Sequence, residues 1–154
     1  MRVLLVSHET SRTGAPRVAV MAVRTLAASG HTVRVVARAP GPLLPELAAE
    51  APTTVEPLGR VRRRLWTWGP TRSLALALDT AVATALLLRD RPDLLYLNSA
   101  SSAAYLRPAR WLGISTLLHV HESGAVAGTF LAANRAPRDL SGVCLLYTSD
   151  AADD

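Results

Sequence analysis

The feature that most constrains this chain is its regular alternation of short apolar runs, rich in β-branched residues, with longer segments of helical periodicity. The runs that fit strands are Arg2 to Ser7, His31 to Ala37, Thr53 to Pro57, Leu94 to Leu97 and Ile114 to Val120. Short, continuously apolar runs are typical of parallel strands covered on both faces. The segments between them predict helices at Pro16 to Gly30, Leu43 to Glu50, Thr71 to Arg89 and Ala103 to Leu112, the last kinked or broken at Pro108. The predicted fold class is α/β, a Rossmann-like open parallel sheet with helices on both faces.

Composition narrows the class of protein. Of the 154 residues, 49% are hydrophobic and 19% charged, which suits a domain with a buried core and excludes disordered, collagen-like and disulfide-scaffold chains. With one cysteine, Cys144, no internal disulfide or cysteine-based zinc site can form, so we expect a cytoplasmic protein. The longest apolar segment, Ser73 to Leu88, contains Asp79 and is shorter than the roughly 20 residues of a membrane span, which predicts a buried helix.

The end of the chain has a different character. The ten residues from Cys144 to Asp153 resemble the translation of a transposon adapter used in sequencing libraries, and the alternative is a natural tail. On the first interpretation, residues 1–143 are an incomplete N-terminal domain and residues 144–154 an artefact tail. Without the three aspartates of that tail the net charge rises from +5 to +8, and all 17 basic residues are arginine. This arginine bias indicates GC-rich coding and a bacterial source.

Polar residues follow two of the predicted strands where those strands end. Asn98 and Ser99 come after the strand that begins at Leu94, and His121 and Glu122 come after the strand that begins at Ile114. Open α/β sheets bind ligands beyond the carboxyl ends of their strands. We therefore expect all four residues to lie at a substrate-binding edge.

Gly14 and Ala15 stand at the start of the first predicted helix. A glycine there lets the backbone approach a ligand, and the helix N-terminus attracts an anion or a hydroxyl group; the alternative is a glycine needed only for a tight turn. The loop has no G-x-G-x-x-G, and a chain without lysine cannot carry a P-loop. NAD enzymes and P-loop NTPases are thereby excluded, and no cofactor is predicted.

His119 and His121 fall on the same side of their strand because side chains alternate with a period of two. One interpretation is a pair of metal ligands, which we do not favour because the body of the chain has no cysteine and only scattered carboxylates. In another, His121 hydrogen-bonds a substrate hydroxyl or phosphate while Glu122 holds its tautomer or a sugar hydroxyl. In the third, His121 is a satisfied residue at a strand end. Hydrolysis through a G-x-S-x-G elbow is excluded because that motif is absent.

The segment from Gly59 to Gly69 combines arginines with tryptophans. Arg62, Arg63, Arg64, Trp66 and Trp68 are its candidate contact residues. A solvated loop is one interpretation. Arginine beside tryptophan also suits an anionic membrane surface or a lipid-linked acceptor, and this is the contact we predict. Nucleic acid could use the same residue types but is not the predicted partner.

Four segments in the expected order resemble the N-terminal domain of GT-B glycosyltransferases of the family 4 type. They are Met1 to Glu9, Thr13 to Val33, Pro92 to Ser99 and His119 to Glu122. In that family the glycine-rich loop after the first strand lines the interdomain cleft, and a histidine after the later strand contacts the transferred sugar. The resemblance implies the first role for Gly14 and the second, catalytic role for His121, with Glu122 beside it.

The chain also departs from that family. Many members have two glycines followed by Ala-Glu in the first loop, whereas this chain has Gly14 followed by Ala15 and Pro16. Members bind the nucleotide diphosphate mainly through a second Rossmann-like domain with a pair of glutamates, and this sequence contains no such domain. The resemblance implies a fragment of a retaining glycosyltransferase that moves a sugar from a nucleotide-sugar donor to a saccharide or lipid-linked acceptor.

We expect that fragment to be inactive without the donor-binding domain, and the enzyme to be cytoplasmic and peripheral at the inner face of the membrane. The alternative function is that of a stand-alone, non-catalytic Rossmann or flavodoxin-like binding domain.

Overall fold

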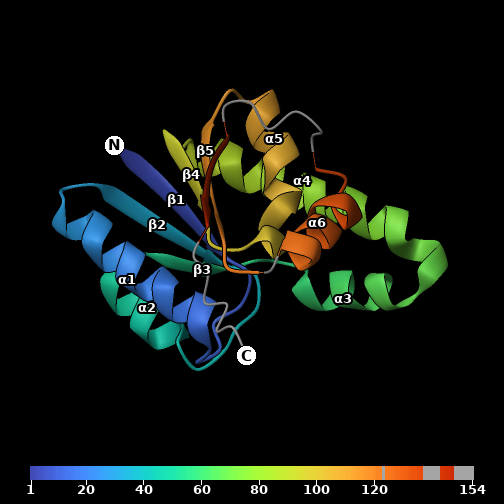
Figure 1. Cartoon of the computed structure of the whole chain (residues 1–154), viewed down its shortest axis with the longest axis horizontal. Helices are drawn as coiled ribbons and strands as arrows, with labels where there is room; N and C mark the ends of the chain where they lie inside the picture. The colour runs from blue at the N-terminus through green and yellow to red at the C-terminus, as the bar shows by residue number, and fades with distance from the viewer. Residues whose placement is uncertain (123, 137–142, 148–154) are drawn as a thin grey trace.

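The computed structural model of the chain describes residues 1–122, 124–136 and 143–147. Within these residues six parallel strands form one sheet in the order β3-β2-β1-β4-β5-β6 (Figure 1). The strands are β1 (Arg2–Ser7), β2 (Thr32–Ala37), β3 (Thr53–Val55), β4 (Leu94–Leu97), β5 (Ser115–Val120) and β6 (Val143–Tyr147). The five predicted strands are confirmed. The order reverses direction between β1 and β4, which is where open sheets of this kind form a binding crevice.

Helices cover both faces of the sheet, as predicted. They are α1 (Gly14–Ala28), α2 (Leu44–Glu50), α3 (Gly59–Thr67), α4 (Arg72–Asp90), α5 (Leu106–Trp111) and α6 (Gly124–Ala133), with short 3₁₀ helices η1 (Gly69–Thr71) and η2 (Ala100–Tyr105). Alternate residues of β1 serve two separate cores. Val3 and Leu5 pack with α1 and α2, while Leu4 and Val6 pack with α4, α5 and α6. Because both faces of β1 are buried, its sequence is continuously apolar rather than alternating.

We predicted a kink or a break at Pro108, and the structure has no break there. The helix type changes earlier, from η2 to α5 at Tyr105 and Leu106, and Pro108 lies in the first turn of α5. Proline is tolerated in the first turn because its missing N–H would have no helical partner there.

A helix occupies most of the arginine-rich segment, for which a solvated loop was one interpretation. Within Gly59–Thr67, α3 has no fully buried residue, and it contacts α4. Pro57 and Pro70 lie just outside it, so the prolines delimit this helix instead of preventing it.

The long apolar helix α4 is confirmed, but it is only partly buried. Leu74 and Leu88 are 58% and 51% exposed, and the buried positions are Ala75, Asp79, Ala83, Leu86 and Leu87. By length and composition, Gly69–Asp90 is the one described helix that could cross a membrane, a test that core helices also pass. Its Asp79 is buried and ion-paired within the domain, so α4 serves here as a layer of the α/β fold.

One glycine is required by close backbone packing. A Cβ on Gly41 would lie 2.6 Å from the carbonyl oxygen of Thr10, and the nearby Leu43 N–H donates to that same oxygen at 2.8 Å. Gly41 therefore ties the loop after β2 to the loop after β1, at the edge where the strands end.

Residues 144–147 of the predicted artefact tail lie in β6, at the edge of the sheet beside β5. The remaining residues, 148–154, lie outside the described part of the chain. The origin of this tail stays a prediction.

Candidate functional site

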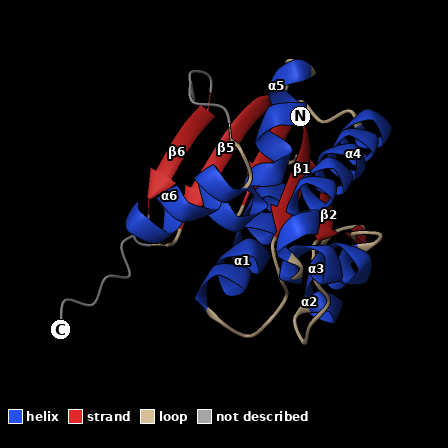
Figure 2. Ribbon diagram, turned by 90° about the vertical axis from the view of Figure 1, so that its right-hand side faces the viewer, coloured by secondary structure: helices blue, strands red, loops and turns tan. Residues whose placement is uncertain are grey.

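The polar residues at the strand ends converge on one edge of the sheet. The strand arrows in Figure 2 point to a common edge, so the residues that follow β1, β4 and β5 are neighbours there. His8 follows β1, Asn98 and Ser99 follow β4, and His121 follows β5. The structure thus brings together Asn98, Ser99 and His121, as the sequence predicted, and adds His8 beside them.

Asn98 links the end of β5 to the start of α1. Its side chain is fully buried, and its Nδ2 donates a hydrogen bond of 2.6 Å to the carbonyl oxygen of Ala15. A carbonyl can only accept, so the amide oxygen must face the other way, where it lies 3.4 Å from Nε2 of His121. This arrangement calls for a proton on Nε2 of His121 and fixes both the tautomer and the orientation of the ring.

His119 packs beneath the imidazole of His121. The two ring centroids are 3.9 Å apart, as expected for neighbours on one side of a strand. The hydroxyl of Tyr96 lies 2.6 Å from Nδ1 of His119, and burial raises the pKa of Tyr96 to about 12. Burial, together with the nearby His121, lowers the pKa of His119. His119 is therefore a neutral, hydrogen-bonded support for His121.

The described residues contain no group of three His, Cys, Asp or Glu side chains that could hold a metal ion.

Glu122 and Ser99 bind each other. The Ser99 hydroxyl donates to the Glu122 carboxylate, which also accepts from the backbone N–H groups of His121 at 3.1 Å and Ala100 at 3.3 Å. Burial acts to raise the pKa of Glu122, but these hydrogen bonds outweigh it and the pKa is lowered. Glu122 is thus an ionised carboxylate that links the ends of β4 and β5 by hydrogen bonds. It lies beside any ligand of His121 and supports that site.

His8 completes the edge, although it was not among the predicted site residues. Its Nε2 lies 3.6 Å from the Glu9 carboxylate, and its buried Nδ1 has no hydrogen-bond partner among the described residues. Burial lowers the pKa of His8, with Glu9 and Glu122 opposing that shift. The sequence signal was Ser7-His8-Glu9 directly after a buried strand.

Gly14 and Ala15 lie at the N-terminus of α1, beside Asn98. Gly14 is exposed, a Cβ there would contact nothing within 4 Å, and the side chain of Thr13 does not cap the helix. The domain's own packing therefore does not need this glycine, and the Thr13 side chain leaves the first N–H groups of α1 without a cap.

The arginine-rich helix divides into an inner and an outer side. Arg62 forms ion pairs with Glu56 and Asp79. Arg63 and Arg64 are exposed, Trp66 is half-buried, and Trp68 is 72% exposed. Because Arg62 pairs with internal carboxylates, it is not available for the predicted contact with a membrane or acceptor. For Arg63, Arg64, Trp66 and Trp68 that contact stays a prediction.

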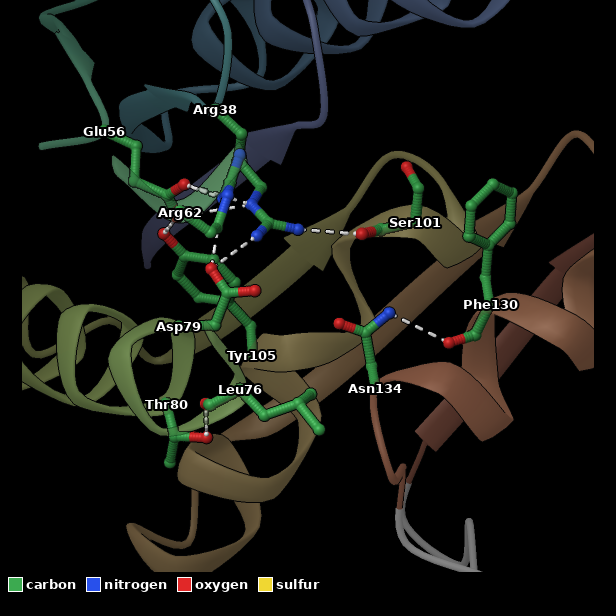
Figure 3. Close-up of polar contacts among 10 residues, drawn as sticks. All are labelled: Arg38, Glu56, Arg62, Leu76, Asp79, Thr80, Ser101, Tyr105, Phe130 and Asn134. Carbon is green, nitrogen blue, oxygen red and sulfur yellow. Dashed lines mark hydrogen bonds and ion pairs between the residues drawn. The ribbon is translucent and has the colours of Figure 1, made fainter. Parts of the chain in front are cut away.

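A buried ion-pair cluster lies behind α3, and few features of the sequence indicated it (Figure 3). The guanidinium of Arg38 is 3.2 Å from the Glu56 carboxylate and 3.0 Å from Asp79 Oδ1, and it donates to the Ser101 carbonyl at 2.7 Å. The Tyr105 hydroxyl donates to Glu56 at 2.7 Å. Burial opposes the charge on Arg38, but Glu56 and Asp79 raise its pKa. The only sequence signal was Asp79 inside an apolar helix.

The chain resembles known glycosyltransferases at two levels. Residues 13–144 match the family described as glycosyl transferase 4-like domain. No curated protein sequence matches the chain.

Solved structures resemble its fold. The glycosyltransferase SsfS6 of Streptomyces sp. SF2575 is 19% identical with a TM-score of 0.52, over 87% of this chain and 45% of its own. The glycotransferase of kitacinnamycin is 15% identical with a TM-score of 0.54, over 92% of this chain and 37% of its own. The spinosyn rhamnosyltransferase SpnG is 19% identical with a TM-score of 0.50, over 87% and 38%. The chain thus spans less than half the length of these structures.

Proposed function

This chain belongs to the glycosyl transferase 4-like domain family, and on that premise we propose that it forms the acceptor-side domain of a retaining glycosyltransferase. The enzyme moves a sugar from a nucleotide-sugar donor to an acceptor. Donor binding resides mainly in a second domain, which residues 1–143 lack. The domain alone is inactive because the leaving diphosphate has no groups to stabilise its charge in the transition state.

The observation that carries this proposal is the placement of His121 beside the open N-terminus of α1. Asn98 contacts both elements, and it holds the His121 ring through Oδ1 and the Ala15 carbonyl through Nδ2. An imidazole held in one orientation suits contact with a hydroxyl of the transferred sugar, and uncapped helical N–H groups suit an oxygen of the ligand. Glu122 and Ser99 position this pair by joining the ends of β4 and β5.

The outer side of α3 supports the second part of the proposal, peripheral contact with the inner face of a membrane. Arg63 and Arg64 are exposed beside Trp68, and no ion pair occupies them within the described residues. Arginine and tryptophan at one surface combine attraction to anionic headgroups with an amphipathic ring at the interface. The enzyme is accordingly a cytoplasmic one that meets its acceptor at the membrane.

The test is sugar transfer by the gene product read from intact genomic DNA across codon 143, compared with residues 1–154. Radiolabelled UDP-, GDP- and dTDP-sugars are supplied with membrane extracts and saccharides as acceptors. We expect transfer by the longer product alone, loss of transfer in its His121→Ala variant, and no loss in Trp111→Ala, an exposed residue of α5. Donor binding without transfer to any acceptor would favour a binding domain and contradict the proposal.

A further inference from the structure

A cavity of about 320 Å³ opens beside the buried ion-pair cluster. It lies between four elements, with Trp66 on α3, Asp79 on α4, Ser101 on η2 and Phe130 on α6, and Asn134 just after α6. Figure 3 shows Asp79, Ser101, Phe130 and Asn134. Its volume is at the low end of the roughly 300–1,000 Å³ typical of small-molecule sites, which fits a ligand about the size of one ring.

The floor of the cavity carries hydrogen-bonding groups but little net charge. Asp79 and Arg38 line it and are only 3% and 6% exposed. The positive charges of Arg38 and Arg62 are balanced by those of Glu56 and Asp79. Arg63 also borders the cavity, but it is exposed, so solvent and salt screen its charge. The balanced charge of the buried groups favours a neutral polar ligand over an anion.

Two oxygen atoms in the cavity are open to a hydroxyl donor. Asp79 accepts the hydrogen bonds of both arginines through Oδ1, and Asn134 donates through Nδ2 to the Phe130 carbonyl at 2.9 Å. In Figure 3 the second carboxylate oxygen of Asp79 and the amide oxygen of Asn134 point toward the same space. Neither of these two oxygens accepts a hydrogen bond from the part of the chain that the structure describes.

Aromatic rings supply the apolar part of the lining. Trp66 and Phe130 are both half-buried and border the cavity. A pyranose ring combines one face of weakly polar C–H groups, which packs on an aromatic ring, with hydroxyl groups at its edge that donate to carboxylate and amide oxygens. A hydrocarbon chain would cover Asp79 without giving it a hydrogen bond, which costs free energy.

The cavity connects to the strand-end site through a hydrogen-bonded series. The hydroxyl of Ser101 lies 2.6 Å from that of Ser99, and Ser99 donates to Glu122, next to His121 in the sequence. A ligand in the cavity is therefore held beside the same sheet edge as His121.

We propose that this cavity binds a pyranose ring of the acceptor, so that the acceptor is a glycoside or saccharide. The ring packs on Trp66 or Phe130, and its hydroxyls donate to Asp79 Oδ2 and Asn134 Oδ1. The substrate class rests on the proposed function, but the binding of the sugar does not.

The experiment titrates the 154-residue chain with methyl glucopyranoside, galactopyranoside and mannopyranoside, followed by saturation-transfer NMR. Inorganic phosphate and cyclohexanol serve as the anionic and the apolar comparison ligands. We expect at least one pyranoside to bind, and the Asn134→Ala and Trp66→Ala variants each to weaken that binding about tenfold. The matched control is Trp68→Ala, because Trp68 is exposed and does not border the cavity. Far-UV circular dichroism verifies that each variant is folded.

The inference is overturned if the folded chain binds no pyranoside, if it binds phosphate or cyclohexanol but no pyranoside, or if the Trp68 variant loses binding as much as the other two. Its failure can be told apart from that of the proposed function. If the chain binds a pyranoside but the longer gene product transfers no sugar, the cavity is a sugar site and the proposed enzyme function is contradicted. If the longer product transfers sugar to acceptors that lack a pyranose, and no pyranoside binds, the enzyme function stands and the cavity proposal is contradicted.

Discussion

Asn98 Oδ1 lies 3.4 Å from Nε2 of His121, while the opposite end of the same amide is bonded to the backbone of α1. A single buried side chain thus sets the position of the predicted catalytic histidine relative to the helix N-terminus that faces it. Asn98 is fully buried and does not itself contact solvent. We therefore regard it as a positioning residue.

Replacing Asn98 with alanine should destabilise the domain by about 2 kcal/mol, because the Ala15 carbonyl loses its partner in a buried setting. The free energy of unfolding in urea measures this effect. In the longer gene product the same variant should lower kcat more than it raises KM, since the His121 ring loses its orientation. The control is Asn134→Ala, a half-buried amide whose loss should cost under about 1 kcal/mol. An Asn98 variant as stable as the control would contradict the assignment.

Two glycines in neighbouring loops should respond oppositely to alanine. Gly41→Ala places a Cβ 2.6 Å from the Thr10 carbonyl oxygen and should cost about 1–3 kcal/mol through overpacking. Gly14→Ala meets nothing within 4 Å at the first position of α1, so stability should stay the same or rise slightly. Thermal unfolding of the two variants checks this. If the Gly14→Ala variant is folded but transfers less sugar in the longer product, the ligand occupies the space beside Gly14.

Stability should fall as the pH is lowered from 7 toward 5. Burial lowers the pKa values of His8 and His119 in the folded state. As the pH falls below the ordinary pKa of histidine, the unfolded chain therefore binds more protons than the folded chain does. The stability that these neutral rings confer is present above pH 6.5 and is lost on acidification, by at most about 1.4 kcal/mol per pH unit for each.

Urea unfolding from pH 8 to pH 5 measures that slope. In a His8→Gln, His119→Gln double variant, the free energy of unfolding should change less between pH 8 and pH 5. Each protein is compared with its own stability at pH 8. Glu122, whose lowered pKa makes it a stabilising carboxylate, adds a further loss only as the pH falls below about 4.5. A slope that is unchanged in the double variant would contradict the assignment to these histidines.

The sequence was enough to predict the sheet, because strands buried on both faces leave continuous apolar runs such as Leu4 to Val6. It also placed Asn98 and His121 at one edge, since parallel strands share the direction of their carboxyl ends. It did not reveal the partners of Asp79. Arg38 is 41 residues away in sequence, and nothing in a local pattern indicates which buried charges will meet.

The partial exposure of α4 could not be predicted for a related reason. Leu74 and Leu88 are exposed, whereas the small residues Ala75 and Ala83 are buried. Small side chains allow a helix to pack closely against its neighbours. A pattern of hydrophobic residues alone does not indicate that the small ones will be buried before the large ones. The helix α3 was missed for another reason: its anchor is the ion-paired Arg62 in place of an apolar face.

The outer side of α3 should bind anionic vesicles. The 154-residue chain should sediment with phosphatidylglycerol vesicles at low salt, much less with phosphatidylcholine, and less again at high salt because the attraction is screened. Replacing Arg63 and Arg64 with glutamine and Trp68 with alanine should weaken the binding at least tenfold, at about 1 kcal/mol for each arginine. Trp111→Ala is the control, because Trp111 is 64% exposed but lies on α5. Equal losses in both variants would rule out α3 as the contact surface.

The measurement that tests the central claim most directly is the sequence of the gene across codon 143, read from intact genomic DNA in a library made without transposon adapters. The claim that this chain is the acceptor-side domain of a two-domain glycosyltransferase predicts that the frame continues past Val143 into a second α/β domain with a pair of glutamates. A frame that instead encodes Cys144 to Asp154 and then stops would contradict the claim. It would leave a binding domain as the function of the chain.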